Sequence, residues 1–515
     1  MVSSVDRLRS PDRASVAGGV TAGSFRAKTR DLTVPTELTT VKRALIHTFG
    51  CQMNVHDSRR IEEVLRGQGY GLAERPEDAD LVVFNTCSVR EKADHKLYSA
   101  VGTLRALKER NRELVIAVSG CLAQQQGDAL LSRLPLVDVV VGPDNLADLP
   151  ELVRHVEDGG PPVAKTEFDL VAPTFLRATA SKQHREVAAY VTVMKGCDER
   201  CTYCIVPYTR GSERYRPAQD IIDEIAALVA GGVREITLLG QTVNSWHEPG
   251  ELPGDARRDE SRFAALLYRI AEEVPELLRL RYTSPHPRHV TEALVTAHRE
   301  LSMLPAHVHL PVQSGSDRML RRMLRRYRRD EFIERARLLQ SARPGFTLST
   351  DIIVGFPDET AEDFELTLSL VREVGFVGAF GFKYSPRPHT PALRFEDDVA
   401  EPLKAERLAR LFEVTEGLQQ AHLQRLVGSS TRVLFEGRSR GSASTPAGYD
   451  RFMGRSERNE IVHVDVPRGA DPTGLCLAVR VEEANRHSLL ASLLEPLPEH
   501  ALTAGRTPLR LPVVS

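Results

Sequence analysis

The segment AAYVTVMKGCDERCTYCIVPYTRG (188–211) decides the fold of the central part of the chain, because an apolar strand run leads directly into a cysteine loop. Cys197, Cys201 and Cys204 lie within eight residues, just past the predicted strand end. Intervals of three and two residues curl one loop so that three sulfur atoms face one point. A four-iron cluster takes four ligands, usually cysteines, so three nearby cysteines leave one iron open to a small molecule.

A zinc site is the alternative for this loop. Structural zinc usually has four Cys or His ligands, and no fourth ligand stands at zinc spacing. We therefore favour the iron–sulfur cluster.

The surrounding sequence, residues 183–413, alternates strand and helix patterns. Six strand-plus-helix units in one domain favour an α/β barrel or partial barrel. The apolar strand runs are 188–194, 235–240, 278–284, 307–312, 347–356 and 376–385.

An N-terminal region at 41–157 shows a similar alternation and predicts a parallel sheet covered on both faces. Cys51, Cys87 and Cys121 each follow directly after a predicted strand, at separations of 36 and 34 residues. Neighbouring parallel strands end at the same sheet edge, so the three thiols are expected to converge there. Three buried free cysteines that pack as small hydrophobes are the alternative.

The remaining segments have weaker patterns. We expect a disordered tail at 1–40, a linker at 158–182, a small all-β barrel at 416–486 and a loose tail at 487–515. The predicted fold is thus α/β in the first two domains, with a terminal β-barrel. The loop around 247–261 is expected to be mobile, and Cys476 is expected in the core.

Composition excludes several classes of protein. The net charge is −2 over 515 residues, so the whole chain does not have the charge of a nucleic-acid binder. Seven cysteines are too few for a secreted disulfide framework. The sequence shows neither a signal peptide nor an apolar run of membrane-spanning length, which predicts a cytoplasmic protein without a membrane partner.

Several motifs together resemble the methylthiotransferase family of radical S-adenosylmethionine (SAM) enzymes. They are GlyCysGlnMetAsn (50–54), AsnThrCysSerValArgGluLysAla (85–93), the cysteine loop, HisLeuProValGlnSerGlySer (309–316) and AspIleIleValGlyPheProAspGluThr (351–360). The likeness covers roughly residues 41–486, and it is strongest to the branch that modifies dimethylallyladenosine in tRNA. It identifies the terminal barrel as similar to a TRAM domain, an RNA-binding module.

The resemblance implies two [4Fe-4S] clusters, one on Cys197, Cys201 and Cys204 and an auxiliary one on Cys51, Cys87 and Cys121. It implies that SAM is cleaved to a radical, that a second SAM provides a methyl group, and that a methylthio group joins C2 of adenosine at tRNA position 37. We expect SAM contacts from residues near strand ends and from the ring before the third cysteine: Tyr203, Gly240, Gln241, Ser284, Gln313 and Asp351. Local turn capping or core packing is the alternative for each.

The same resemblance implies the partners: the tRNA anticodon stem-loop and an electron donor such as flavodoxin or ferredoxin, with the chain a monomer. Other readings stay open, namely methylthiolation of a ribosomal protein aspartate or of threonylcarbamoyladenosine, an iron–sulfur electron carrier with an RNA-binding tail, and a zinc-stabilised RNA-binding protein. Two residues depart from the family pattern, with Thr242 where Asn is common and His389 where Gly is expected.

An arginine-rich stretch, RMLRRMLRRYRR (318–329), has apolar residues at helical spacing, which predicts one core face and one basic face. The basic face is either solvated or in contact with RNA phosphates. In the terminal barrel, the mixture of Tyr449, Arg451, Phe452 and Arg455 would suit backbone contact and base stacking.

Overall fold

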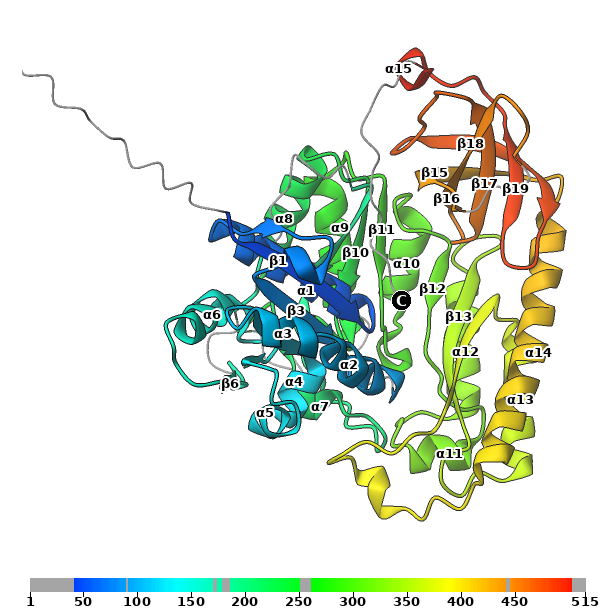
Figure 1. Ribbon diagram of the computed structural model, residues 1–515. Helices are drawn as coiled ribbons and strands as arrows, with labels where there is room; N and C mark the ends of the chain where they lie inside the picture. The colour runs from blue at the N-terminus through cyan, green and yellow to red at the C-terminus, as the bar shows by residue number, and fades with distance from the viewer. Residues whose placement is uncertain are drawn as a thin grey trace, which may run out of the picture. The chain divides into compact units, whose positions relative to one another are not determined.

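The computed structural model describes residues 41–88, 91–169, 174–177, 186–250, 261–440 and 445–502. The predicted tail at 1–40, most of the predicted mobile loop and the chain end from residue 503 lie outside these residues. The described chain forms an N-terminal parallel sheet with helices, a central series of β/α units and a closed β-barrel (Figure 1).

The N-terminal sheet has the strand order β2-β1-β3-β4-β5-β6, and every neighbouring pair is parallel. Its strands are β1 (Arg43–Phe49), β2 (Gly71–Leu72), β3 (Leu81–Thr86), β4 (Val115–Gly120), β5 (Val139–Val141) and β6 (Val163–Lys165). Its helices are α1 (Gln52–Gly67), α2 (Glu91–Thr103), α3 (Arg105–Arg110), α4 (Cys121–Gln126), α5 (Asp128–Arg133) and α6 (Leu149–Glu157), with 3-10 turns at Pro76–Asp78 and Leu146–Asp148.

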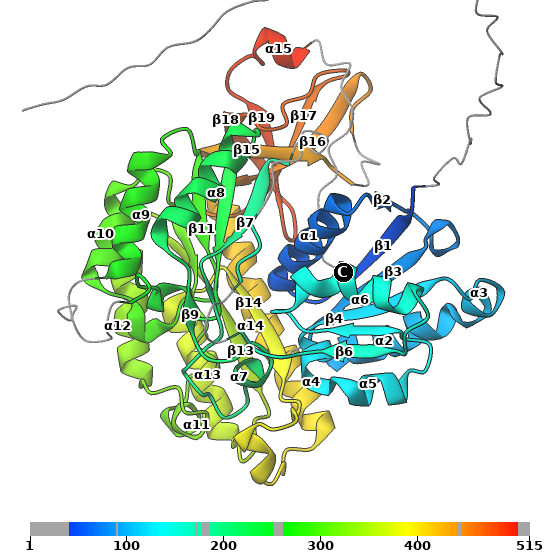
Figure 2. The same cartoon turned by 90° about the vertical axis from the view of Figure 1, so that its left-hand side faces the viewer.

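Apolar residues on both faces of this sheet explain why helices cover it twice. Val82 and Phe84 pack with residues of α2, α4 and α5, whereas Leu81 and Val83 pack with residues of α1 and α6. Figure 2 shows these helices around the N-terminal sheet. Successive side chains of a strand point to opposite faces, so a continuous apolar run requires cover on both. The predicted two-faced parallel sheet is confirmed.

The central region contains two three-stranded parallel sheets, β11-β10-β7 and β12-β13-β14. No pairing joins β11 to β12 within the described residues, so the six strands form a partial barrel, as expected. One core of mutually packed apolar residues spans both sheets and includes Ile236, Leu280, Val308 and Leu348.

The strands of this region are β7 (Ala188–Thr192), β8 (Met194–Lys195), β9 (Arg214–Tyr215), β10 (Glu235–Leu239), β11 (Arg279–Tyr282), β12 (His307–His309), β13 (Thr347–Val354) and β14 (Gly378–Lys383). Its helices are α7 (Val206–Thr209), α8 (Ala218–Ala230), α9 (Arg262–Glu273), α10 (Glu292–Glu300), α11 (Asp317–Arg322), α12 (Arg329–Gln340), α13 (Ala361–Val374) and α14 (Glu401–Leu426). Its 3-10 turns are Val243–Ser245, Pro287–His289 and Pro391–Arg394.

The C-terminal barrel closes in the order β15-β16-β17-β19-β18 and confirms the predicted small β-barrel. All pairs are antiparallel except β17 with β19. Its elements are β15 (Ser430–Arg438), β16 (Tyr449–Ser456), β17 (Ile461–Pro467), β18 (Cys476–Ala484), β19 (Leu489–Leu493) and a final helix α15 (Glu499–Leu502). Cys476 is half-buried at the start of β18 rather than in the core.

Three boundary predictions are wrong in part. The predicted end of the central domain at 413 and the predicted barrel start at 416 both fall within α14, and the first barrel strand begins at Ser430. The predicted linker at 158–182 contains β6, which pairs with β5 and extends the N-terminal sheet. The predicted loose tail contains β19, which pairs with β17 and β18 and closes the barrel. Both strands are short. They form because they pair with neighbouring strands, and a local sequence pattern does not reveal such pairing.

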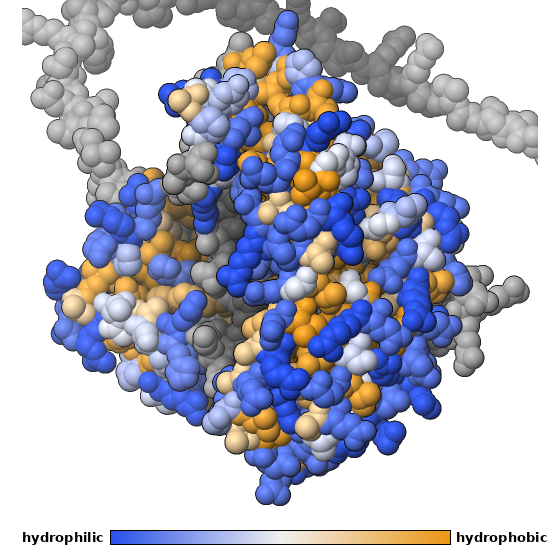
Figure 3. Space-filling model, turned by 90° about the vertical axis from the view of Figure 1, so that its right-hand side faces the viewer, coloured by the Kyte–Doolittle hydropathy of each residue, from blue (hydrophilic) through white to orange (hydrophobic). Residues whose placement is uncertain are grey.

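Among the described helices, none combines the length and the apolar content that a membrane crossing needs. Figure 3 shows hydrophilic residues over most of one face, with hydrophobic residues in several separate groups.

Candidate functional site

The loop cysteines are the three sulfur-bearing residues of the central region, Cys197, Cys201 and Cys204. Pairing of β8 with β9 closes their loop, and the Cys197 amide donates to the Gly211 carbonyl at 3.1 Å. Gly196 stands at the entry with φ +82°, and a Cβ there would collide with the Ser212 carbonyl oxygen. A glycine is therefore needed for the chain to turn into the loop.

Cys201 of these loop cysteines is buried, and Cys197 and Cys204 are half-buried. Cys197 Sγ lies 3.1 Å from the Thr242 hydroxyl, and burial raises the pKa of Cys197 to about 11. Burial, together with the neighbouring Cys201 and Cys197, raises the pKa of Cys204. A metal that binds thiolates offsets both the burial and the mutual repulsion.

The ligand count favours a cluster over zinc at the loop cysteines. Structural zinc usually has four Cys or His ligands. Among the described residues, the group of Cys, His, Asp or Glu side chains whose ligand atoms lie within 4.8 Å of one another is Glu199, His286 and His289, and it contains none of the loop cysteines. Three cysteines without a fourth ligand fit a [4Fe-4S] cluster that keeps one iron open.

The sheet cysteines are the corresponding residues of the N-terminal sheet, Cys51, Cys87 and Cys121. Cys51 precedes α1, Cys87 follows β3 and Cys121 begins α4 directly after β4. β1, β3 and β4 are adjacent parallel strands, and the Cys87 amide donates to the Phe49 carbonyl of β1 at 2.9 Å. The three thiols thus lie at one sheet edge, where their positions after successive strands predict them.

Direct contacts support the approach of two of these thiols. A side-chain hydrogen bond from Cys87 lowers the pKa of Cys51 to about 6. A Cβ at Gly50 would lie 2.6 Å from the Cys87 Cβ, and one at Gly120 would collide with the Thr86 carbonyl oxygen. Glycines before Cys51 and Cys121 therefore allow the strand ends to come close.

Arg210 connects the segment that carries the loop cysteines to the sheet cysteines. This residue follows α7, six positions after Cys204, and is 4% exposed. Its Nε donates to Cys121 Sγ at 3.3 Å, and its Nη2 donates to Asp57 Oδ2 of α1 at 2.6 Å. Although burial opposes ionisation of Asp57, Arg210 lowers its pKa. The sheet cysteines thus contact the segment that carries the loop cysteines.

Arg325 has a similar position at the loop cysteines. It is 6% exposed, and its Nη1 donates to Cys201 Sγ at 3.4 Å. Its other acceptors are the Tyr327 hydroxyl at 2.9 Å and the Pro311 carbonyl at 3.0 Å. The Thr202 amide also donates to the Met323 carbonyl at 3.0 Å, so the segment around Arg325 packs directly on the cysteine loop.

The arginine stretch is not one amphipathic helix. α11 ends at Arg322 and α12 begins at Arg329, because Leu324 and Arg326 have left-handed φ values of +56° and +54°. Leu324, predicted in the core, is 45% exposed, whereas Met319, Leu320, Met323 and Tyr327 are buried.

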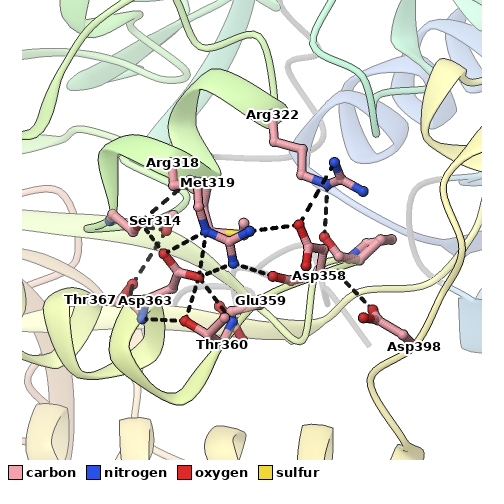
Figure 4. Close-up of polar contacts among 12 residues, drawn as sticks. Ser314, Arg318, Met319, Arg322, Asp358, Glu359, Thr360, Asp363, Thr367 and Asp398 are labelled. Carbon is pink, nitrogen blue, oxygen red and sulfur yellow. Dashed lines mark hydrogen bonds and ion pairs between the residues drawn. The ribbon is translucent and has the colours of Figure 1, made fainter.

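Most arginines of this stretch are held by internal partners rather than presented as one free basic face. Arg318 pairs with Asp358 and Asp363, and Arg322 Nε donates to the Pro357 carbonyl at 3.0 Å (Figure 4). Arg329 pairs with Glu373 at 2.9 Å.

The residues expected to contact SAM lie mostly at strand ends. Gly240 and Gln241 follow β10, and the buried Gln241 Oε1 has no hydrogen-bond partner among the described residues. Ser284, after β11, and Gln313, after β12, have left-handed φ values of +57° and +74°. Such strain gathers at functional sites.

The other two of these residues have clear neighbours. Asp351 lies within β13, where its carboxylate is 3.3 Å from His309 Nε2. The Tyr203 ring packs edge-on to Phe356 at 6.4 Å between centroids, in the pattern of core packing. Their contact with SAM stays a prediction.

The two departures from the family pattern differ in consequence. Thr242 contacts a loop cysteine, as noted above, so its hydroxyl belongs to the surroundings of the cysteine site. His389 has φ +66°, a conformation that glycine adopts without strain, which explains the expected glycine. Its ring packs beside the Tyr208 ring, with 6.0 Å between the two ring centroids.

In the terminal barrel, Phe452 is 1% exposed and part of the core, so its predicted stacking on bases is wrong. Arg451 pairs with Asp465 at 2.7 Å. Tyr449 is 45% exposed and remains available for stacking.

Sequence reasoning missed Asp57, Arg210 and Arg325 as parts of the site. Arg210 and Arg325 lie 89 and 124 residues from the cysteines they contact, and no local motif links such pairs. The only available signal was their position: Arg210 closes the motif that contains the loop cysteines, and Arg325 lies within an unusual arginine run.

Comparison with known proteins gives two family matches. Residues 43–142 match the model described as uncharacterized protein family UPF0004, and residues 191–371 match the radical SAM superfamily. A curated relative, the tRNA-2-methylthio-N(6)-dimethylallyladenosine synthase of Sorangium cellulosum (strain So ce56), is 57% identical over 465 residues, which cover 88% of this chain and 93% of the relative.

Solved structures with similar folds are more distant. The radical S-adenosylmethionine methyltransferase TsrM from Kitasatospora setae is 15% identical with a TM-score of 0.49, over 68% of this chain and 75% of that one. The cobalamin-dependent S-adenosylmethionine radical enzyme OxsB is 14% identical with a TM-score of 0.44, over 74% and 56% of the two chains.

Proposed function

Because this chain belongs to the family of the tRNA-2-methylthio-N(6)-dimethylallyladenosine synthases, we propose that it transfers a methylthio group to C2 of N6-dimethylallyladenosine beside the tRNA anticodon. The observation that carries the proposal is the pair of three-cysteine sets, because Arg210, from the segment that carries the loop cysteines, donates a hydrogen bond to Cys121 of the other set. One set alone is compatible with many radical SAM reactions, whereas a second set beside it is what sulfur insertion requires.

The loop cysteines fit a [4Fe-4S] cluster and SAM, the cofactors of the radical SAM superfamily that matches this region. Bound there, the cluster supplies the electron that cleaves SAM to a radical able to remove hydrogen from an unreactive aromatic C–H bond. The chain contributes three thiolate ligands, a loop fixed by Gly196, and burial that keeps water away.

We assign the sheet cysteines to a second [4Fe-4S] cluster, which these three thiolates would hold and which would supply the sulfur for the methylthio group. The adjacent strand ends, the Cys51–Cys87 contact and the Arg210 hydrogen bond to Cys121 support this assignment.

The expected SAM contacts are Tyr203, Gly240, Gln241, Ser284, Gln313 and Asp351. The unpartnered Gln241 Oε1 supports this set, since it is a buried acceptor without a donor among the described residues. Left-handed Ser284 and Gln313 support it further, because their strain lies after β11 and β12, two strands that follow one another along the chain.

The partners follow from the substrate. The proposed substrate is the anticodon stem-loop of tRNA, the proposed electron donor is a flavodoxin or ferredoxin, and the chain is proposed to act as a monomer. Since tRNA and reduced clusters occur together in the cytoplasm, we propose that compartment.

The decisive test uses anaerobically reconstituted protein with SAM, a reductant and an anticodon stem-loop that carries dimethylallyladenosine. We expect 5′-deoxyadenosine, S-adenosylhomocysteine and the 2-methylthio nucleoside. Cys204→Ala should abolish 5′-deoxyadenosine, whereas Cys121→Ala should retain 5′-deoxyadenosine and lose the methylthio product.

The seventh cysteine gives a matched control. Cys476→Ala, in the terminal barrel, should leave all three products unchanged. If tRNA from a deletion strain keeps its normal level of 2-methylthio-adenosine, the tRNA substrate is wrong, and a ribosomal protein is the next substrate to test.

A further inference from the structure

Among the described residues, each cysteine set has one buried arginine whose guanidinium donates a hydrogen bond to sulfur. Arg210 donates to Cys121 at 3.3 Å, and Arg325 donates to Cys201 at 3.4 Å. Arginine stays protonated in proteins, so each brings a full positive charge into the interior beside a thiol.

The two charges are compensated differently. Arg210 also donates to the buried carboxylate of Asp57, which offsets its charge. The other acceptors of Arg325 are a phenol and a backbone carbonyl, and within the described chain no carboxylate forms an ion pair with it. A buried cation without a counter-ion is strongly unfavourable. The Arg325 site therefore requires an anion.

We propose that the iron–sulfur cluster on the loop cysteines is the counter-ion of Arg325, and that Arg325 raises the reduction potential of this cluster. The inference rests on the proposed function, because it takes both cysteine sets as cluster ligands. Arg325 acts through Cys201 and is thus a positioning residue.

Charge explains the direction of the effect. A [4Fe-4S] cluster with three thiolates is anionic and gains a further negative charge when it accepts one electron. A nearby cation stabilises the reduced state more than the oxidised state, since the attraction grows with the cluster's charge. Arg210 raises the reduction potential of the cluster on the sheet cysteines by less, because the Asp57 carboxylate already neutralises its charge.

The test is a redox titration of the full-length, fully reconstituted protein without SAM, followed by electron paramagnetic resonance. SAM is added after the titration to identify the clusters. The signal whose spectrum then changes belongs to the cluster on the loop cysteines. Arg325→Gln should disfavour its reduction at least tenfold, which is 59 mV for one electron. Arg325→Lys, which keeps the charge, should restore most of the potential.

A matched control lies three residues earlier. The Arg322 guanidinium stacks over Phe395 at 4.3 Å and donates to the Pro357 carbonyl, and it has no thiol contact in the described part of the chain. Arg322→Gln should leave the potential unchanged. Arg210→Gln should shift only the other cluster, and by less than tenfold.

The possible outcomes separate this inference from the proposed function. An unchanged potential in Arg325→Gln at full iron content overturns the inference. If Arg325→Gln cannot hold the cluster, retention in Arg325→Lys supports a charge requirement, and loss in both variants overturns it. Wild-type protein with no SAM-sensitive signal contradicts the proposed function instead.

Discussion

At the scale of single residues, Gly196 controls whether the loop cysteines reach their positions. Its left-handed φ and the close Ser212 carbonyl leave no room for a Cβ. We expect Gly196→Ala to open the loop, so that the protein loses about half of its iron and all formation of 5′-deoxyadenosine. Iron analysis and product analysis of reconstituted protein measure both effects.

The matched control is Gly417, which lies inside α14 with open space around its Cα. Gly417→Ala should raise the free energy of unfolding by roughly 0.5–1 kcal/mol, because alanine loses less backbone entropy in a helix. Its iron content should not change. Full iron in Gly196→Ala would contradict the role given to this glycine.

Glu460 provides a pH-dependent prediction. It is 8% exposed and accepts from His422 of α14 at 2.7 Å. Although burial opposes ionisation, hydrogen bonds from His422 and Ser456 lower the pKa of Glu460 to about 2. An unfolded glutamate has a pKa of about 4.3. The ionised form therefore stabilises the fold above about pH 4.3, and this stabilisation is lost as pH falls through 2.

We expect Glu460→Gln to lower the free energy of unfolding at pH 7 by on the order of 2–3 kcal/mol. The deficit should shrink as the pH falls below 4, because the wild-type carboxylate becomes protonated. Denaturant titrations of cluster-free protein at pH 7 and pH 3 measure it, with the exposed Glu482→Gln as control. A deficit that does not depend on pH would show that lost packing, not charge, is the cause.

The convergence of the sheet cysteines was predictable because each follows a recognisable strand and parallel strands end together, and the loop cysteines were recognisable from their close spacing in one loop. The arginines beside them were not, since contacts such as Arg325 with Cys201 depend on where a distant segment folds back. Thr242 illustrates the difference. Its departure from the family pattern is visible in the sequence, but its contact with Cys197 depends on how two distant segments fold together.

At the scale of elements, the pattern of apolar residues predicted most strands correctly. It failed where the backbone conformation of single residues determines where a helix ends. The stretch 318–329 has helical spacing throughout, yet left-handed Leu324 and Arg326 interrupt it. This interruption points the Arg325 side chain toward the interior. In a continuous helix Arg325 would lie on the basic face with the other arginines. β6 and β19 were missed because they have three and five residues and are ordered by their neighbours.

At the junction of α11 with α13, Asp363 forms both a helix cap and an ion pair with Arg318, so the contributions of the two interactions to stability can be compared (Figure 4). Asp363 is 4% exposed, accepts from the Ser316 hydroxyl at 2.5 Å and forms a capping box with Thr360 at the start of α13. The Arg318 side chain that pairs with it is 41% exposed. We expect Asp363→Ala to cost about 2–4 kcal/mol, because it removes a cap and a buried acceptor.

Arg318→Ala should cost about 1 kcal/mol or less, since exposed ion pairs contribute little. Chemical denaturation of the two variants measures the difference. Equal costs would mean that the ion pair, and not the cap, holds the junction.

At the scale of the whole molecule, polar contacts connect α1, which follows Cys51, to the central region that carries the loop cysteines. Its side chains that reach the central region are His56, Asp57, Arg59 and Arg60, which contact Thr192, Arg210, Glu186 and Glu224. Sequence patterning assigns such residues to the solvent side of a helix, so this junction could not be predicted. A polar junction has directional bonds and fixes one orientation more strictly than apolar packing does.

A double-mutant cycle on Asp57 and Arg210 tests whether this junction acts as one unit. Asp57→Asn leaves a buried guanidinium without its carboxylate and should cost about 3–5 kcal/mol in cluster-free protein. The double variant with Arg210→Gln removes both charges, so its cost should fall short of the sum of the single costs by at least about 1 kcal/mol. Denaturant unfolding of cluster-free chains excludes any contribution from bound iron. Additive costs would mean that the remaining contacts of α1 hold the two cysteine sets together, and that Arg210 acts on Cys121 alone.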